Sequence, residues 1–415
     1  MSLSPTVLLE DAHALVGDIA DLRHRLHREP ELGLHLPRTQ EKILAALDGL
    51  PYEITLGKDT TSVTAVLRGG VAQDDGDTPV VLLRGDMDAL PVQETTGVPY
   101  SSVLDGVMHA CGHDLHTAML AGAATLLAER RAELPGDVVL MFQPGEEGHD
   151  GAGVMIREGV LEAAGRRPDA AYGLHVTSSL LPTGMFASRA GALMSASDSL
   201  LITVRGAGGH GSSPHTAKDP VTVAAEIVTQ LQVMITRQFN MFDPVVLSVG
   251  VLTAGTQRNI IPETARIEAT VRTFSAENRD RMAEAAPRLV RNITAAHGLE
   301  ADVEYLDEYP LTVTDHAETA HAEAQVAELL GAARYVTMTQ PMSGSEDFSR
   351  ILEAVPGTFV FLSAVTPGAE PATAPFNHSP YAVFDDSVLA DGAALYAQLA
   401  VSRLIAGPAS RSPAG

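Results

Sequence analysis

The sequence contains one cysteine, few basic residues and no uninterrupted long apolar run. The single cysteine, Cys111, excludes an intrachain disulfide and is compatible with a reducing compartment. Lys and Arg number 28 against 52 Asp and Glu, so the formal net charge is −24, which argues against a nucleic-acid partner held by a basic face. No run reaches the roughly 18–20 apolar residues that span a bilayer. The start of the chain also lacks a signal-peptide pattern, so we expect a cytoplasmic protein without a membrane partner.

The composition is that of a globular protein with more than one domain. The chain has 415 residues, of which 45% are hydrophobic and 19% charged, and this length predicts two or three domains. Short apolar runs predict strands that are buried on both faces; they lie at 79–84, 137–142, 170–176 and 358–362. A helix is predicted between the first two, at about 117–131. Alternating strands and helices predict an α/β fold with a mostly parallel core sheet.

The stretch from 190 to 305 has a different order of predicted elements. The pattern gives strand 199–205, helix 220–237, strand 245–252, strand 265–273, helix 276–297 and strand 301–305. This β-α-β-β-α-β order is typical of the ferredoxin-like unit, which can form a small domain. We therefore predict a discontinuous large domain, 1–189 and 306–415, with a second domain, 190–305, inserted into it.

Side chains that bind metals or move protons gather just after the predicted strands of the large domain. They are Asp86 and Asp88 after the first strand, Cys111, His113 and His116 before the next helix, Glu146 and Glu147 after the second strand, His175 at the end of the third, and His378 after the last. In α/β sheets, sites form at the carboxyl ends of the strands. Thiolate, imidazole and carboxylate groups are ligands for zinc and similar ions. The pattern therefore favours a metal-dependent hydrolase.

Each of these residues also has a simpler interpretation. A lone cysteine such as Cys111 is usually a small buried hydrophobe, and His175 could be a hydrogen-bonded core histidine. The pair Glu146 and Glu147 could belong to a solvated turn, and the two aspartates could cap a helix or turn. The metal hypothesis depends on their recurrence at successive strand ends, and on a glycine that lets Cys111 and His113 face one point.

A glycine-rich segment at 206–211 matches the dinucleotide-binding pattern G-x-G-x-x-G. That pattern requires a helix that begins immediately and an acidic residue about 20 positions later, at the end of the next strand. Here a polar segment intervenes before the next predicted helix, and Glu226 falls inside that helix. A dehydrogenase is therefore disfavoured, and the segment is better interpreted as an exposed turn that presents His210.

Taken together, these motifs resemble those of the aminoacylase-like metallo-amidohydrolases, the group that includes hippurate hydrolase, N-acyl-L-amino-acid amidohydrolases and indoleacetyl-amino-acid hydrolases. The resemblance covers about residues 20–400 and is carried by eight blocks in order. They are RGDMDALP (84–91), HACGHDLHTAML (109–120), QPGEEG (143–148), GLHV (173–176), GGHGSSPH (208–215), RNIIP (258–262), GSEDF (344–348) and NHSP (377–380). It implies a zinc-peptidase-like α/β domain that carries a lid and dimerisation domain.

The resemblance also implies a role for each matching residue. The metal ligands would be Cys111, His113, Glu147, His175 and His378, and the general base Glu146. Asp88 matches an acidic residue that orients a ligand. The related peptidases have His-x-Asp where this sequence has Asp86-Met-Asp88, so the role of Asp86 stays open. His210 matches a lid histidine that reaches the substrate carbonyl, and Arg258 and Asn259 match a segment that binds the far end of the substrate.

The implied activity is metal-dependent hydrolysis of the amide bond of N-acyl amino acids, which gives a carboxylic acid and a free amino acid. One or two divalent ions per subunit (Zn, Mn, Co or Ni) would activate water, and Glu146 would carry its proton to the departing nitrogen. The expected assembly is a homodimer or homotetramer. The nearest alternative is a dipeptidase or aminopeptidase on the same scaffold. A metal-free binding protein is disfavoured because Glu146 and all the ligands are present.

Overall fold

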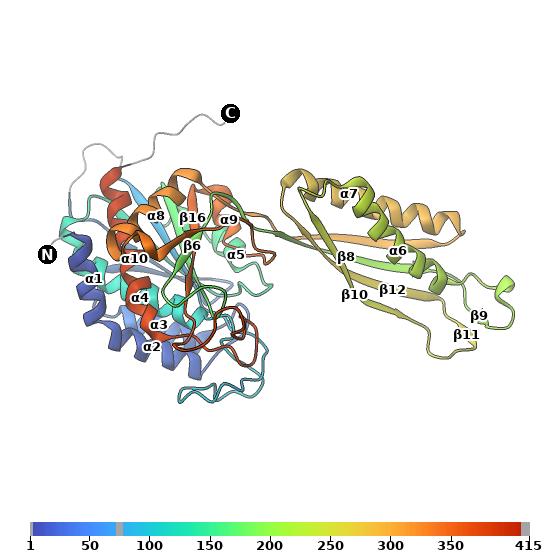
Figure 1. The fold of residues 1–415 in the computed structure, drawn as a ribbon, viewed down its shortest axis with the longest axis horizontal. Coiled ribbons are helices and arrows are strands. Elements are labelled where there is room, and N and C mark those ends of the chain that lie inside the picture. Colours follow the sequence, from blue (N-terminus) through green and yellow to red (C-terminus); the bar gives the residue numbers. More distant parts are fainter. Residues whose placement is uncertain (1–2, 72–77, 408–415) are drawn as a thin grey trace. The chain divides into compact units, whose positions relative to one another are not determined.

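The computed structural model of the chain describes residues 3–71 and 78–407. The chain forms two compact units (Figure 1). The first unit comprises Met1–Gly191, Val313–Thr339 and Arg350–Gly415, and the second comprises Ala192–Thr312 and Gln340–Ser349. Each unit has its own cluster of buried apolar residues.

The first unit is built on an eight-stranded mixed sheet, counted over the described residues. Its strand order is β1-β2-β4-β3-β5-β16-β6-β15. The strands are β1 (Tyr52–Leu56), β2 (Val63–Leu67), β3 (Val80–Asp86), β4 (Asp137–Gln143), β5 (Ala170–Thr177), β6 (Phe186–Ser188), β15 (Tyr335–Thr337) and β16 (Gly357–Ser363). The central strands β4, β3, β5 and β16 are mutually parallel, which confirms the predicted core. The pairings β1–β2, β2–β4 and β16–β6 are antiparallel, so the sheet as a whole is mixed.

The helices of the first unit cover this sheet. They are α1 (Pro5–Ala14), α2 (Val16–Arg28), α3 (Pro37–Leu47), α4 (His113–Glu129), α5 (Gly151–Arg157), α8 (His316–Leu330), α9 (Ser349–Ala354) and α10 (Leu389–Ala406). Helices α4 and α10 pack against each other and against β3 and β5. Strands β3, β4 and β16 are buried along their whole length, because helices and loops cover both faces of a parallel core.

Helix α10 and the residues just before it form an apolar segment that the sequence pattern did not single out. Among the described residues, Asp386–Ala406 is long and apolar enough to cross a membrane, but 89% of its apolar window is buried inside the protein. It contains Asp391 and Arg403, both buried. Asp391 accepts a hydrogen bond from Arg334, and Arg403 donates to Glu318. The segment is therefore a helix of the protein core.

The second unit is a four-stranded antiparallel sheet with two helices. Its elements are β8 (Ala196–Arg205), α6 (Pro220–Gln238), β10 (Val245–Ala254), β12 (Thr264–Thr273), α7 (Ala276–Ala296) and β13 (Glu300–Tyr309). The strand order β10-β12-β8-β13 is that of the predicted β-α-β-β-α-β unit. A small two-stranded sheet, β9 (Gly209–His210) with β11 (Ile260–Ile261), lies between these elements in the chain. The helix expected by a dinucleotide fingerprint does not follow β8, because α6 begins only at Pro220.

The limits of the second unit differ from the expected 190–305. Strand β13 continues to Tyr309, which pairs with Ser197, so the unit extends to Thr312. The segment Gln340–Ser349, which the sequence pattern assigned to the large domain, also belongs to the second unit. Its Met342 exchanges backbone hydrogen bonds with Leu193 and Ser195. The short strands β7 (Gly191–Met194) and β14 (Thr312–Thr314) pair where the chain passes between the units.

Candidate metal centre

The predicted ligands of the first unit lie at one edge of its sheet. Strands β3, β4 and β5 are parallel, so their carboxyl ends meet at the same edge. Asp86 is the last residue of β3, and Glu146 and Glu147 follow the end of β4. His175 lies near the end of β5.

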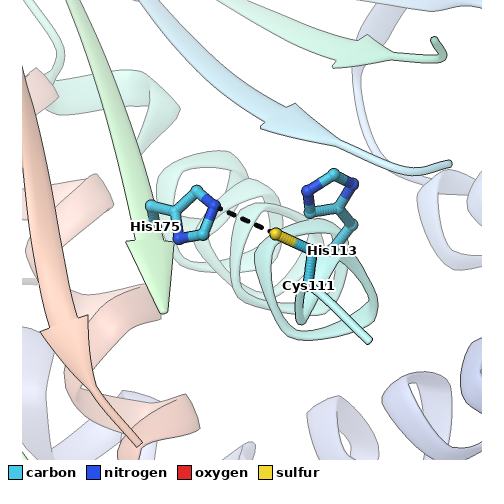
Figure 2. A group of neighbouring side chains, drawn as sticks. All are labelled: Cys111, His113 and His175. Carbon is cyan, nitrogen blue, oxygen red and sulfur yellow. Dashed lines mark hydrogen bonds between the residues drawn. The ribbon is translucent and has the colours of Figure 1, made fainter. Parts of the chain in front are cut away.

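Cys111 and His113 are brought to this edge by the start of α4. The helix begins at His113, earlier than the predicted 117, so the histidines at 113 and 116 belong to its first two turns and do not precede it. The difference arises because Gly112 takes a left-handed conformation, with φ +85°, that ends the preceding loop. A Cβ atom at this glycine would lie 2.3 Å from Val176 Cγ2. Only glycine fits there, and it lets the side chains of Cys111 and His113 turn toward His175 (Figure 2).

The five predicted ligands form overlapping groups of three. In each group the potential ligand atoms lie within 4.8 Å of one another. One group is Cys111, His113 and His175, and another is Cys111, Glu147 and His378. The Sγ atom of Cys111 lies 3.5 Å from His175 Nε2 and 3.3 Å from His378 Nε2, which in turn lies 3.2 Å from Glu147 Oε1. Cys111 is thus common to the two groups.

The donor atoms of the cluster suit a divalent ion. His113 Nδ1 donates to the carbonyl of Asp88 at 2.9 Å, and His175 Nδ1 donates to the carbonyl of Val176 at 2.8 Å. Each ring therefore keeps Nε2 unprotonated when neutral, which is how metal-binding histidines are usually oriented. His113 Nε2 is buried without a hydrogen-bond partner, and Glu147 Oε1 is buried 3.2 Å from His378 Nε2. A buried polar atom without a partner is costly, and a cation held by the Glu147 carboxylate would satisfy His113 Nε2.

The protonation of the histidines reflects their neighbours. Hydrogen bonding to Cys111, followed by hydrogen bonding to Glu147, raises the pKa of His378 to about 10. Burial opposes a charge on His113, but Asp86 and then Cys111 raise its pKa well above the ordinary value. Burial, reinforced by His116, lowers the pKa of His175. Because imidazole must be neutral to bind a metal, His378 and His113 would have to lose a proton when they hold an ion.

Asp86, whose role the sequence left open, takes part in a buried hydrogen-bond network. Its side chain accepts from Arg84 Nη1 at 2.7 Å and from His116 Nδ1 at 2.6 Å. The other ring nitrogen of His116 accepts from the backbone N–H of Val176 at 2.7 Å. Asp86, His113 and His116 lie close enough to be considered for a metal, but both nitrogens of His116 already have partners. The network therefore supports the end of β5 beside His175.

Asp88 contacts the segment that carries the two glutamates. Its Oδ1 accepts the backbone N–H of Glu146 at 3.0 Å, and its Oδ2 accepts that of Glu147 at 3.1 Å. Its carbonyl also orients His113. Asp88 therefore positions the candidate base and two candidate ligands, and this arrangement accounts for a buried carboxylate at this position.

A buried cluster behind the first turn of α4 was not found from the sequence. Asp114 accepts from Arg23 Nε at 2.7 Å and from His27 Nδ1 at 2.9 Å, and Arg23 and His27 both come from α2. Burial opposes ionisation of Asp114, but Arg23 and then His27 hold its pKa well below the ordinary value. Arg23 and His27 are remote from Asp114 in the sequence. The only local signal was that both are polar residues on the amphipathic helix α2.

The three site residues predicted outside the large domain all lie in the second unit. His210 pairs with Ile260 across the β9–β11 sheet, and the backbone N–H of Gly211 donates to the carbonyl of Asn259 at 2.8 Å. His210 Nδ1 accepts from the hydroxyl of Ser212 at 2.7 Å. His210, Arg258 and Asn259 are exposed. The structure therefore brings His210 and Asn259 together within the second unit, on a sheet separate from the four-stranded one.

The fold and the cluster define a metal-dependent hydrolase with an α/β catalytic unit. Comparison with known families gives its place: the chain belongs to peptidase family M20/M25/M40, whose profile matches residues 82–402. A divalent metal is consistent with a similar solved structure, a dinuclear metal-binding peptidase of the M20 family, the YXEP protein of Bacillus subtilis. That structure has 33% sequence identity and a TM-score of 0.79, over 94% of this chain and 98% of the other.

Curated relatives within the family are named for different substrates. The chain is 36% identical to thermostable carboxypeptidase 2 of Saccharolobus solfataricus, over 95% of this chain and 97% of the relative. It is 36% identical to N-acetylcysteine deacetylase of Bacillus subtilis, over 92% and 96%. It is also 36% identical to the IAA-amino acid hydrolase ILR1-like 4 of Arabidopsis thaliana, over 92% and 85%. All three are similar to this chain along nearly its whole length.

Proposed function

We propose that this protein hydrolyses the amide bond of N-acyl amino acids and releases a carboxylic acid and a free amino acid. The observation that carries the proposal is the convergence of Cys111, His113, Glu147, His175 and His378 at one sheet edge, with Glu146 beside them. The relatives named as an N-acetylcysteine deacetylase and an IAA-amino acid hydrolase act on bonds of this type by their names.

In the proposed site, Cys111, His113, Glu147, His175 and His378 would hold one or two divalent ions. A bound divalent ion lowers the pKa of water toward neutrality and polarises a carbonyl group. Cys111 is nearly buried, and Glu147 is largely so, so few water molecules compete with these ligands. Thiolate and imidazole suit Zn, imidazole also suits Ni, and carboxylate suits Mn, so the mixed set does not select one of the expected ions Zn, Mn, Co and Ni.

Glu146 serves as the general base. Amide hydrolysis needs a proton removed from the attacking water and a proton delivered to the departing nitrogen, and one carboxylate can do both in turn. The Glu146 side chain is nearly buried, and its backbone N–H is held by Asp88. That bond fixes the backbone position from which the carboxylate projects.

Peptide hydrolysis is the second candidate. A peptide cleaved before its last residue is chemically an N-acyl amino acid whose acyl group is an aminoacyl or peptidyl group. The relative named as a thermostable carboxypeptidase favours this alternative. The two candidates share the metal cluster and Glu146, and they differ in whether the accepted acyl group carries a free amino group.

A substrate panel separates the candidates. Hippurate, N-acetyl amino acids and dipeptides are assayed with protein loaded with Mn, Zn, Co or Ni after removal of metal by a chelator. We expect the highest kcat/KM for hippurate or an N-acetyl amino acid. We expect no activity from the metal-free protein. Faster hydrolysis of dipeptides would replace the proposal with the peptidase alternative, and full activity of the metal-free protein would refute both.

A further inference from the structure

The side chain of Asn377 joins three segments that carry candidate metal ligands. Its Nδ2 donates to the carbonyl of Cys111 at 3.1 Å and to the carbonyl of Val176 at 3.0 Å. Its Oδ1 accepts from the backbone N–H of Ser178 at 3.0 Å and lies 3.2 Å from the Ser178 hydroxyl, whose single proton faces the nearer carbonyl of Pro375 at 2.7 Å. Nitrogen faces two acceptors and oxygen faces a backbone donor, so one orientation of the amide satisfies all three hydrogen bonds.

Each contact lies next to a candidate ligand. Cys111 is itself one, Val176 follows His175, and Asn377 precedes His378. The Nδ2 atom also lies 3.9 Å from Cys111 Sγ. One amide therefore connects the loop before α4, the end of β5 and the segment around His378.

The segment around His378 needs such a connection. His378 has a left-handed backbone, with φ +72°, which a residue with a Cβ atom rarely adopts. Its side chain is 53% exposed, so packing alone does not hold it. Its backbone N–H donates to the carbonyl of Ala110 at 2.8 Å, and the hydroxyl of Ser178 donates to the carbonyl of Pro375 at 2.7 Å. These bonds and the amide of Asn377 together keep His378 facing Cys111.

We propose that Asn377 is a positioning residue that sets the geometry of the metal centre before an ion binds. The inference rests on the metal role proposed above for Cys111, His175 and His378. A ligand set held in place by hydrogen bonds loses little conformational freedom when the ion enters, which raises its affinity. Because Asn377 Nδ2 also holds the carbonyl of Cys111, it would fix the backbone from which the thiolate reaches the ion.

The test compares metal affinity and cobalt spectra in matched variants of the full chain. Asn377→Ala removes the amide, and Asn377→Asp keeps its size and its acceptor but places oxygen against two carbonyl groups. Asn278→Ala and Asn278→Asp are the controls, because Asn278 is a buried asparagine of the second unit whose Nδ2 donates to the carbonyl of Asp243 at 2.8 Å. Binding of Mn²⁺ is measured by calorimetry, and thermal unfolding in chelator checks the fold of each variant.

We expect both Asn377 variants to bind Mn²⁺ roughly 10–100-fold more weakly, with a shifted thiolate-to-cobalt absorption band in the Co²⁺ form, while the Asn278 variants match the wild type. If the alanine variant is poorly folded, the aspartate variant supplies the answer because it keeps the side-chain volume. Wild-type affinity or tighter binding in a folded Asn377 variant, with an unchanged cobalt band, overturns the inference. Wild-type protein that binds neither Mn²⁺ nor Co²⁺ instead refutes the proposed function.

Discussion

At the scale of single residues, Glu146 and Glu147 are neighbours with different proposed tasks. Glu147 shares a group of potential ligand atoms with Cys111 and His378, and both glutamates share one with His113, but Glu146 is proposed to move protons. The backbone N–H groups of both are held by the one carboxylate of Asp88. A change confined to the Glu146 carboxylate therefore tests the proton-transfer role with little effect on the ligands.

Replacing that carboxylate with an amide should stop turnover. Glu146→Gln keeps the size of the side chain but removes its basicity, so we expect kcat to fall by at least about 100-fold. Metal content, measured by elemental analysis, should stay at the wild-type value. Turnover close to that of the wild type would show that another group is the base.

Removal of a candidate ligand should reduce the amount of metal that the protein binds. In Cys111→Ala and His378→Ala, we expect less bound metal per chain, because each side chain contributes an atom to the same group of three. Activity of the wild type should vanish in chelator and return when a divalent ion is added. A full complement of metal in both variants would exclude the proposed ligand set.

At the scale of elements, the start of α4 sets the relation between two candidate ligands. Gly112 is needed there both for its left-handed φ and for the lack of space beside Val176. The hydrogen bonds of His113 and His175 to backbone carbonyls depend on the same junction between helix and strand. A small displacement of the helix start would therefore move Cys111 and His113 away from His175.

Gly112→Ala should weaken both the fold and the metal centre. The left-handed conformation alone costs alanine roughly 1–2 kcal/mol, and the contact with Val176 adds to this cost. Gly159→Ala is a matched control, because Gly159 also has positive φ, +93°, but no atom lies within 4 Å of the added Cβ. The stability measured by chemical denaturation and the affinity for Mn²⁺ should both fall further in Gly112→Ala than in Gly159→Ala. If Gly112→Ala and Gly159→Ala lose the same stability and both keep the wild-type affinity for Mn²⁺, the proposed role of Gly112 is wrong.

At the scale of the whole molecule, the candidate residues are divided between two units. The five ligands and Glu146 belong to the first unit, and His210 and Asn259 belong to the second. His210 lies on an exposed turn of the small β9–β11 sheet. We propose that a second copy of the chain supplies His210 to the active site, in a homodimer formed through the second unit.

Mixing two inactive variants tests this arrangement. Glu146→Gln and His210→Ala should each be nearly inactive alone. In a mixed dimer, one of the two sites combines an intact Glu146 with an intact His210 from the other subunit, so activity should return once subunits exchange. Exchange is followed by fluorescence energy transfer between labelled chains. Demonstrated exchange without recovered activity would exclude a shared site.

The amino-acid sequence by itself determined the elements of both units and the chemical groups of the candidate site. Apolar runs such as 137–142 and the order of patterns between 190 and 305 are local signals, because burial of a strand or helix face requires a particular spacing of apolar residues. The fold predicted from them is confirmed. The proposed ligands could also be selected from the sequence, since each lies in a short motif after a strand, before a helix or in a loop.

Only the tertiary structure decided how the polar side chains pair. Asp86 contacts His116, Asp88 contacts the backbone of Glu146, and Asn377 contacts Cys111. The same holds for the outer antiparallel strands and for Gln340–Ser349, which joins the second unit. The reason is physical: apolar spacing is repeated along one element, but a buried polar group takes whichever partner the fold brings within about 3 Å, and that partner can lie anywhere in the chain.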